Sequence, residues 1–122
     1  MEIAFIDTNI IIEYLKGNQK IIDKLNSFDE VFINEIIIME LYQGAKNRRE
    51  LNYIKKSISK FKILKTSNEI IKLAKDILEE YTLSHNTKIM DAIIASTVLI
   101  YDLKLYTLNV KDFRYLEISL VN

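Results

Sequence analysis

The chain has 122 residues, no cysteine, one histidine, and equal numbers of acidic and basic residues, so its formal net charge is zero. Disulfides, thiolate metal sites and a zinc site of nitrogen and sulfur ligands are therefore excluded, and any metal must be held by oxygen. The length suits one domain over residues 1–122, and about half of the residues are apolar, which is enough for a sizeable core.

Neither end of the chain predicts a membrane or export segment. The N-terminal apolar run is interrupted by Glu2 and Asp7, unlike a signal peptide. No stretch approaches the roughly 18–20 apolar residues of a membrane span. A soluble, cytoplasmic protein is expected.

The first quarter of the chain predicts a strand followed by two helices. A short apolar run at residues 2–6 stops at Asp7 and suits a buried strand. Asn9 is expected to cap the helix that follows, because its side-chain oxygen can accept a free backbone N–H. Apolar residues at helical spacing predict a second short helix after Gly17.

The middle of the chain repeats the alternation of strands and helices. Residues 31–33 predict a short strand, and Asn34 is a good cap for a helix over residues 35–46. Apolar residues then recur at helical spacing over 51–61, with lysines between them. A further strand is expected near residues 61–65.

Two more helices and two more strands are predicted in the last third. Thr66 and Glu69 have the spacing of a capping box and open a helix. Thr87 is expected to cap a helix over residues 88–101, which is nearly all apolar and should be buried. The closing strands are expected at residues 105–108 and 118–121.

Strands separated by helices predict an α/β fold, a three-layer α/β/α sandwich with a mainly parallel central sheet. In such sheets ligands bind outside the carboxyl ends of the strands. Functional residues are therefore expected just after each strand, or at helix starts on the same edge.

Three acidic residues stand out at such positions. Asp7 ends the first strand, where a turn or capping role is the ordinary alternative. Glu40 lies in an apolar helical run, so it belongs either to a solvent-facing stripe or to a site. Asp91 lies in the first turns of a helix with little polar surface, where a buried carboxylate is costly unless it is paired or binds a metal.

A fourth group of polar residues follows the strand expected at 105–108. Thr107, Asn109 and Asp112 are all oxygen donors. Carboxylates gathered on one rim raise one another's pKa, and a hard divalent cation, Mg²⁺ or Mn²⁺, removes that repulsion. Such a cation activates water for an in-line phosphoryl displacement. No Ser–His or Cys–His pair and no glycine-rich phosphate loop offers a different chemistry.

The basic residues are concentrated in one stretch, although the net charge of the chain is zero. Eight of the 17 basic residues lie between positions 46 and 65, where only Glu50 opposes them. This face could meet the phosphates of a nucleic acid, or it could be a solvated helix face. Composition leaves the two interpretations open.

Four motifs in order give a family resemblance over essentially the whole chain. They are Asp7-Thr8-Asn9, Glu40 followed by Gly44-Ala45, Asp91-Ala92-Ile93-Ile94-Ala95, and Thr107-Leu108-Asn109-Val110-Lys111-Asp112-Phe113. Each motif alone is weak. Together, and with this chain length, they resemble the PIN-domain family, in particular its VapC toxin branch.

The resemblance implies an Mg²⁺- or Mn²⁺-dependent endoribonuclease that acts as the toxin of a type II toxin–antitoxin pair. It also implies an RNA substrate, a small antitoxin partner and a homodimer. The residues matching the family's metal ligands are Asp7 and Asp91, and Glu40 completes the catalytic cluster. At the fourth family position this chain has Asn109 instead of an acid, and Asp112 either compensates or is structural.

Two other classes of function stay open from the sequence. A PIN-like module with weak catalysis would act mainly by binding a partner protein; the trio Asp7, Glu40 and Asp91 favours the nuclease, and Asn109 and the zero net charge leave room for the module. A phosphatase or receiver-type domain would use an aspartate at a strand end. That class prefers an aspartate-rich loop after the first strand, where Asp7-Thr8-Asn9 offers one acid.

Overall fold

The centre of the computed structural model, which describes residues 1–122, is a four-stranded parallel sheet in the order β3-β2-β1-β4. The mainly parallel sheet predicted from the sequence is therefore confirmed. The central strand β1 pairs with β2 on one side and β4 on the other, and Ala4 is in register with Val31 and Lys104. The strands are β1 (Ile3–Ile6), β2 (Glu30–Asn34), β3 (Lys62–Leu64) and β4 (Lys104–Tyr106).

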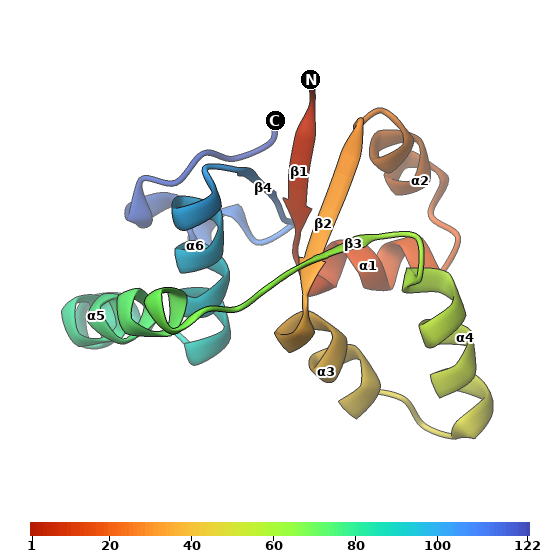
Figure 1. Ribbon diagram of the computed structural model, residues 1–122, viewed down its shortest axis with the longest axis horizontal. Helices are drawn as coiled ribbons and strands as arrows, with labels where there is room; N and C mark the ends of the chain where they lie inside the picture. The colour runs from red at the N-terminus through yellow and green to blue at the C-terminus, as the bar shows by residue number, and fades with distance from the viewer.

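Helices cover both faces of the sheet and complete the expected α/β/α sandwich. In Figure 1, α5 and α6 lie on one side of the strands and α1, α2 and α4 on the other, while α3 lies beyond the carboxyl end of β2. The helices are α1 (Thr8–Leu15), α2 (Gln19–Asn26), α3 (Glu35–Gln43), α4 (Arg48–Ile58), α5 (Asn68–His85) and α6 (Ile89–Tyr101), and the 3₁₀ turns are η1 (Val110–Asp112) and η2 (Arg114–Leu116).

One hydrophobic core joins the strands to the helices around them. Phe5 and Ile6 are fully buried, as are Ala92 and Ala95 on α6. A strand buried on both faces needs a continuous apolar run. The apolar pattern of both segments is thus explained by their place between layers. No helix has the length and apolar character needed to cross a membrane.

Two helix caps differ from the sequence prediction. Asp7, not Asn9, caps α1, and its side chain accepts the N–H of Thr8. Ser67, not Thr66, caps α5 by accepting the N–H of Ile70, while the Thr66 hydroxyl has no partner. The predicted cap lies two residues after the observed one in α1 and one residue before it in α5, because neighbouring polar residues offer equal local capping chemistry.

The last third of the chain holds two further corrections. Thr87 does not cap α6, because its hydroxyl bonds to the carbonyl of Tyr81 and the hydroxyl of Tyr115. The strand expected at 118–121 is a single parallel bridge between Leu120 and Leu105 at the edge of β4. Thr87 bonds to Tyr115 and Leu120 pairs with Leu105, and a local sequence pattern cannot reveal such contacts between distant residues.

Candidate active site

The site lies at the carboxyl edge of the sheet, where the strand order reverses. The chain leaves β1 to one side and reaches β4 from the other, which makes the gap between their ends a topological switch point. Asp7 follows β1 and Thr107 follows β4, and the N–H of Asp7 donates to the carbonyl of Tyr106 at 3.0 Å. The placement just after the strands that the sequence predicted is therefore observed.

Asp7 is fixed by hydrogen bonds from three side- and main-chain groups. Its Oδ1 accepts the N–H of Thr8 at 2.7 Å. Its Oδ2 accepts the hydroxyl of Thr107 at 2.8 Å and the amide of Asn9 at 3.3 Å. The residue is only 7% exposed. Asp7 thus has both roles considered from the sequence, a helix cap and a member of the acidic cluster.

Opposing forces act on the ionisation of Asp7. Burial raises its pKa above the ordinary value, because desolvation disfavours the charged form. The hydrogen bonds from Thr107 and Thr8 lower it in part, since both donate to the carboxylate. The negative charges of Glu40 and Asp112 raise it further. The surroundings of Asp7 therefore disfavour its ionised form.

The pKa of Asp91 is raised as well. Burial, then the charges of Asp7, Asp112 and Glu40, raise its pKa from 3.8 to about 6. Lys88, which precedes α6, opposes this rise. Asp91 is half-buried in the structure, less enclosed than its apolar sequence neighbours predicted. The charges of the three other carboxylates therefore disfavour ionisation of Asp91.

The acidic residues share a cleft of about 380 Å³. Of the five residues predicted from the sequence, four line it: Asp7, Glu40, Asp91 and Asn109. Asp112 does not line the cleft, although its charge reaches Asp7 and Asp91. Glu40 lines this cleft, so it belongs to the site and not to a solvent-facing stripe of α3. Hereafter "the acidic cleft" means this cavity.

The structure does not form a ready-made metal site. Nowhere are three or more aspartate, glutamate or histidine side chains gathered closely enough to hold a metal ion as they stand. The donor chemistry nevertheless fits a hard divalent cation, because the groups are carboxylate and amide oxygens and none of the acids has an ion-pair partner. The ion pairs of the chain, Lys16–Glu13 and Lys62–Glu30, lie elsewhere.

Three residues of the site were not singled out for the role that they have. Asn9 donates to Asp7 and to the Thr107 hydroxyl, and its carbonyl oxygen accepts the N–H of Leu108 at 3.1 Å. Thr107 donates to Asp7 and accepts the N–H of Asn109. Lys88 lines the cleft, and its positive charge lowers the pKa of Asp91. In the sequence, these roles were indicated only by the positions of the three residues close to Asp7, Asn109 and Asp91.

Comparison with known sequences identifies the relatives of this chain. The PIN-domain family model matches residues 4–117. The chain is 30% identical over 119 residues to Ribonuclease VapC2 of Methanocaldococcus jannaschii, covering 80% of this chain and 77% of the relative. It is 33% identical over 118 residues to Ribonuclease VapC of Rickettsia bellii, covering 89% of this chain and 87% of the relative.

Solved structures agree with the fold. A toxin–antitoxin complex from Klebsiella pneumoniae is similar with a TM-score of 0.82 and 29% identity, covering 98% of this chain and 96% of that chain. A DNA-bound VapBC from Salmonella typhimurium is similar with a TM-score of 0.83 and 25% identity, covering 99% and 98%. In each comparison the similarity covers at least 96% of this chain and of the solved chain.

Proposed function

This chain belongs to the PIN-domain family, in its VapC-type branch, and from that premise we propose that it is a metal-dependent endoribonuclease. The observation that carries the proposal is the acidic cleft at the switch point of the sheet, which Asp7, Glu40 and Asp91 line without an ion-pair partner. Relatives named ribonucleases support the choice of RNA as substrate.

In this proposal Asp7, Glu40 and Asp91 hold Mg²⁺ or Mn²⁺, and Asn109 or Asp112 completes the site. A bound divalent cation orients a water, lowers its pKa and stabilises the charge of phosphodiester hydrolysis. The protein's part is to hold the ligands. Thr107, Thr8 and Asn9 orient the Asp7 carboxylate through hydrogen bonds, as outer groups commonly do for metal ligands.

The raised pKa of Asp91 gives the site a pH dependence. At pH 5 a group with a pKa of about 6 is mostly protonated and cannot bind a cation well. Metal affinity, and with it cleavage, should rise as the pH increases through 6. A cation in turn favours the ionised carboxylates and removes the mutual repulsion of the cluster.

We also propose that the protein is a toxin that is silenced by a small cognate antitoxin. Support comes from similar structures that are toxin–antitoxin complexes. A cleft lined by carboxylates without ion-pair partners invites a basic inhibitor, so an Arg or Lys of the antitoxin is expected near Asp7 and Asp91. A bidentate Arg–carboxylate contact is strong and would occupy the position a cation needs. A homodimer is expected as well, to be checked by light scattering.

A second candidate function is a PIN-like module that acts mainly by binding a partner protein. Two observations favour it: the acids are not gathered into a ready-made metal site, and Asn109 is neutral where the family often has an acid. The two candidates differ in one respect that can be measured, which is turnover of RNA.

The test is cleavage of a mixed RNA pool with Mg²⁺ and with EDTA, comparing wild type, Asp7→Asn and Asp76→Asn. Asparagine caps helices as well as aspartate does, so Asp7→Asn should keep α1 while removing a ligand charge. Asp76, an exposed residue of α5, is the matched control. We expect cleavage only with Mg²⁺, and only by wild type and the control. Absence of cleavage by wild type would favour the binding module.

A further inference from the structure

The first turn of α6 carries Asp91 but lies at the margin of the core. Residues 92–98 of this helix are buried, whereas Ile89 is 68% exposed and Asp91 is half-buried. Lys88, the residue before the helix, offers no side-chain hydrogen bond to the free N–H groups of this turn. Neither core packing nor a helix cap therefore holds the turn, and another contact is needed to keep Asp91 in one place.

The Asp91 carboxylate is not held by hydrogen bonds of its own. Asp7 differs in this respect, because it accepts bonds from Thr8, Thr107 and Asn9 that fix both of its oxygens. The groups that act on Asp91 do so by burial and by charge, and no hydrogen-bond donor is among them. The position of Asp91 is therefore set by the position of its helical turn.

One long-range hydrogen bond ties the entrance of α6 to another segment. Thr87 is 6% exposed, its hydroxyl donates to the carbonyl of Tyr81 at 3.4 Å, and it is hydrogen-bonded to the hydroxyl of Tyr115, 28 positions away. The other side-chain bond of this loop, from Lys88 to Asn86, is exposed and spans two residues. The bond between Thr87 and Tyr115 is thus the contact that places the entrance of the helix.

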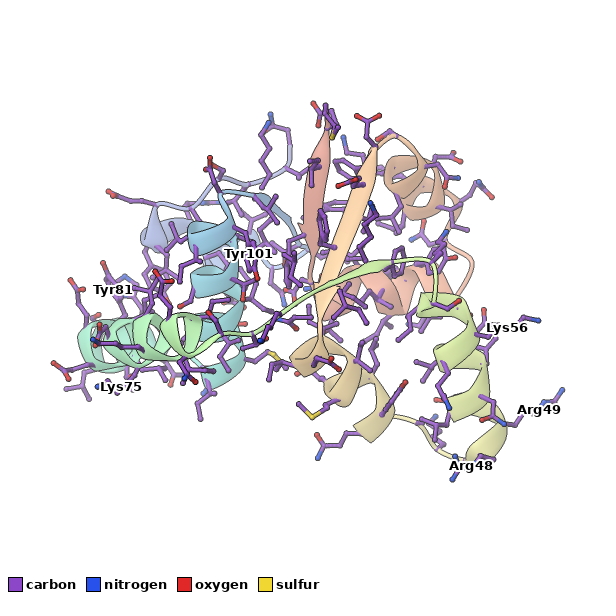
Figure 2. All side chains as sticks on the ribbon, in the orientation of Figure 1. Arg48, Arg49, Lys56, Lys75, Tyr81 and Tyr101 are labelled. Carbon is purple, nitrogen blue, oxygen red and sulfur yellow. The ribbon has the colours of Figure 1, made fainter.

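The ring of Tyr115 is packed by two other rings. It stacks on His85 with ring centroids 4.0 Å apart and 12° between the planes. Tyr81 meets it edge to face, with centroids 5.1 Å apart. Both partners belong to α5, and Figure 2 shows Tyr81 on that helix. Because aromatic pairs in these arrangements are favourable, the Tyr115 hydroxyl is a fixed point against the end of α5.

Tyr115 also belongs to the segment that completes the site. In this segment Asn109 lines the acidic cleft, and the charge of Asp112 acts on Asp91. The 3₁₀ turns η1 and η2 flank Phe113, which is fully buried and anchors the segment in the core. The hydrogen bond to Tyr115 therefore joins the turn that carries Asp91 to the segment that carries Asn109 and Asp112.

Resting on the proposed metal-dependent function, we propose that Thr87 and Tyr115 are positioning residues of the metal site. Their hydrogen bond fixes the first turn of α6 relative to η1, so that Asp91 can bind the same cation as Asn109 or Asp112. Outer hydrogen bonds that orient metal ligands commonly contribute about 10–100-fold to metal affinity. Without this bond the ligands would all remain, but the first turn of α6 would be free to move away from η1.

The experiment removes the bond from either side. Tyr115→Phe and Thr87→Val each remove one hydroxyl and nearly keep the shape of the side chain, whereas Thr87→Ser keeps the hydroxyl. Mn²⁺ affinity is measured by isothermal titration calorimetry at neutral pH without RNA. The cleavage rate at saturating Mn²⁺ and the melting temperature in EDTA are measured for the same proteins.

Tyr101→Phe is the matched control. The hydroxyl of Tyr101 donates to the carbonyl of Lys65 at 3.0 Å, so it also ties α6 to another segment. Tyr101 is the last residue of α6, at the opposite end from Asp91, and Figure 2 shows it on that helix. The control therefore loses a similar hydrogen bond from the same helix without touching the turn that carries the acid.

We expect Tyr115→Phe and Thr87→Val each to weaken Mn²⁺ binding about tenfold, because both act on the cation through Asp91. The double variant should bind no more weakly than either single variant, since all three lack the same bond. Thr87→Ser should retain most of the affinity. Tyr101→Phe should bind Mn²⁺ as wild type does, even where its melting temperature falls. Hydrogen exchange in EDTA should quicken in the first turn of α6 in Tyr115→Phe and not in Tyr101→Phe.

Where wild type binds Mn²⁺ and cleaves RNA, an unchanged affinity in Tyr115→Phe would overturn the positioning role and leave the ribonuclease intact. An equal loss of affinity in Tyr101→Phe would do the same, because it would trace the effect to general stability. Losses that add in the double variant would show that the two hydroxyls act separately, which also contradicts the proposal. A wild-type protein that binds no Mn²⁺ would overturn the proposed function and the positioning role together.

Discussion

Replacing Asp91 with asparagine should stabilise the metal-free protein above pH 6. Burial and then the charges of Asp7, Asp112 and Glu40 raise the pKa of Asp91 from 3.8 to about 6 in the folded protein. The folded state therefore binds a proton more tightly than the unfolded state. Stability contributed by this group is full below pH 3.8 and is lost as the pH rises to about 6.

The size of the effect follows from the displacement of the pKa. A rise from 3.8 to about 6 corresponds to about 3 kcal/mol, at about 1.4 kcal/mol for each pH unit. Asp91 is partly exposed, and solvent screening reduces this value, so a gain of about 1–2 kcal/mol is expected at pH 8. Asparagine does not ionise, and it keeps nearly the same shape in the first turn of α6.

The assay is urea denaturation in EDTA at pH 4 and pH 8, with Asp76→Asn as the control. The free energy of unfolding of Asp91→Asn should exceed that of wild type at pH 8 and match it within about 0.5 kcal/mol at pH 4. The exposed control should match wild type at both. An Asp91→Asn protein that is clearly less stable than wild type at pH 8 would mean that Asp91 is structural, and the electrostatic reasoning would be wrong.

Three further predictions concern the same cleft. Cleavage products should carry a 5′-phosphate and a 3′-hydroxyl, because water, and not the ribose 2′-hydroxyl, is expected to attack the phosphorus while the bond to the 3′-oxygen breaks; a 2′,3′-cyclic phosphate, seen by end-labelling, would exclude this route. Asp7→Asn and Glu40→Gln should each lower the cleavage rate by orders of magnitude in Mg²⁺ while the melting temperature in EDTA stays at or above that of wild type. Thr107→Val should lower the free energy of unfolding by about 1–3 kcal/mol, because Asp7 loses a donor and the Asn109 N–H loses its acceptor; an unchanged urea midpoint would show that these bonds add nothing.

Local patterns were sufficient for the order of the elements. The apolar run before Asp7, the Asn34 cap and the buried pattern of α6 all predicted what is observed. Alternating strands and helices leave few topologies, and that restriction is enough to predict Asp7 and Asn109 at one edge of the sheet. Periodicity and capping are properties of neighbouring residues, so a sequence can state them.

Contacts between residues distant in sequence were decided only by the tertiary structure. Asn9 was expected to cap a helix, yet its amide bonds to Asp7 and to Thr107, which lies 98 residues further along the chain. The basic stretch could have faced the site, yet Arg48, Arg49, Lys55 and Lys56 are all exposed, and none of them lines the acidic cleft or the cavity between α1, α3 and α4. Both outcomes depend on how layers meet in space. The sequence determined which groups reach the rim of the sheet, and the packing of the layers determined which of them touch.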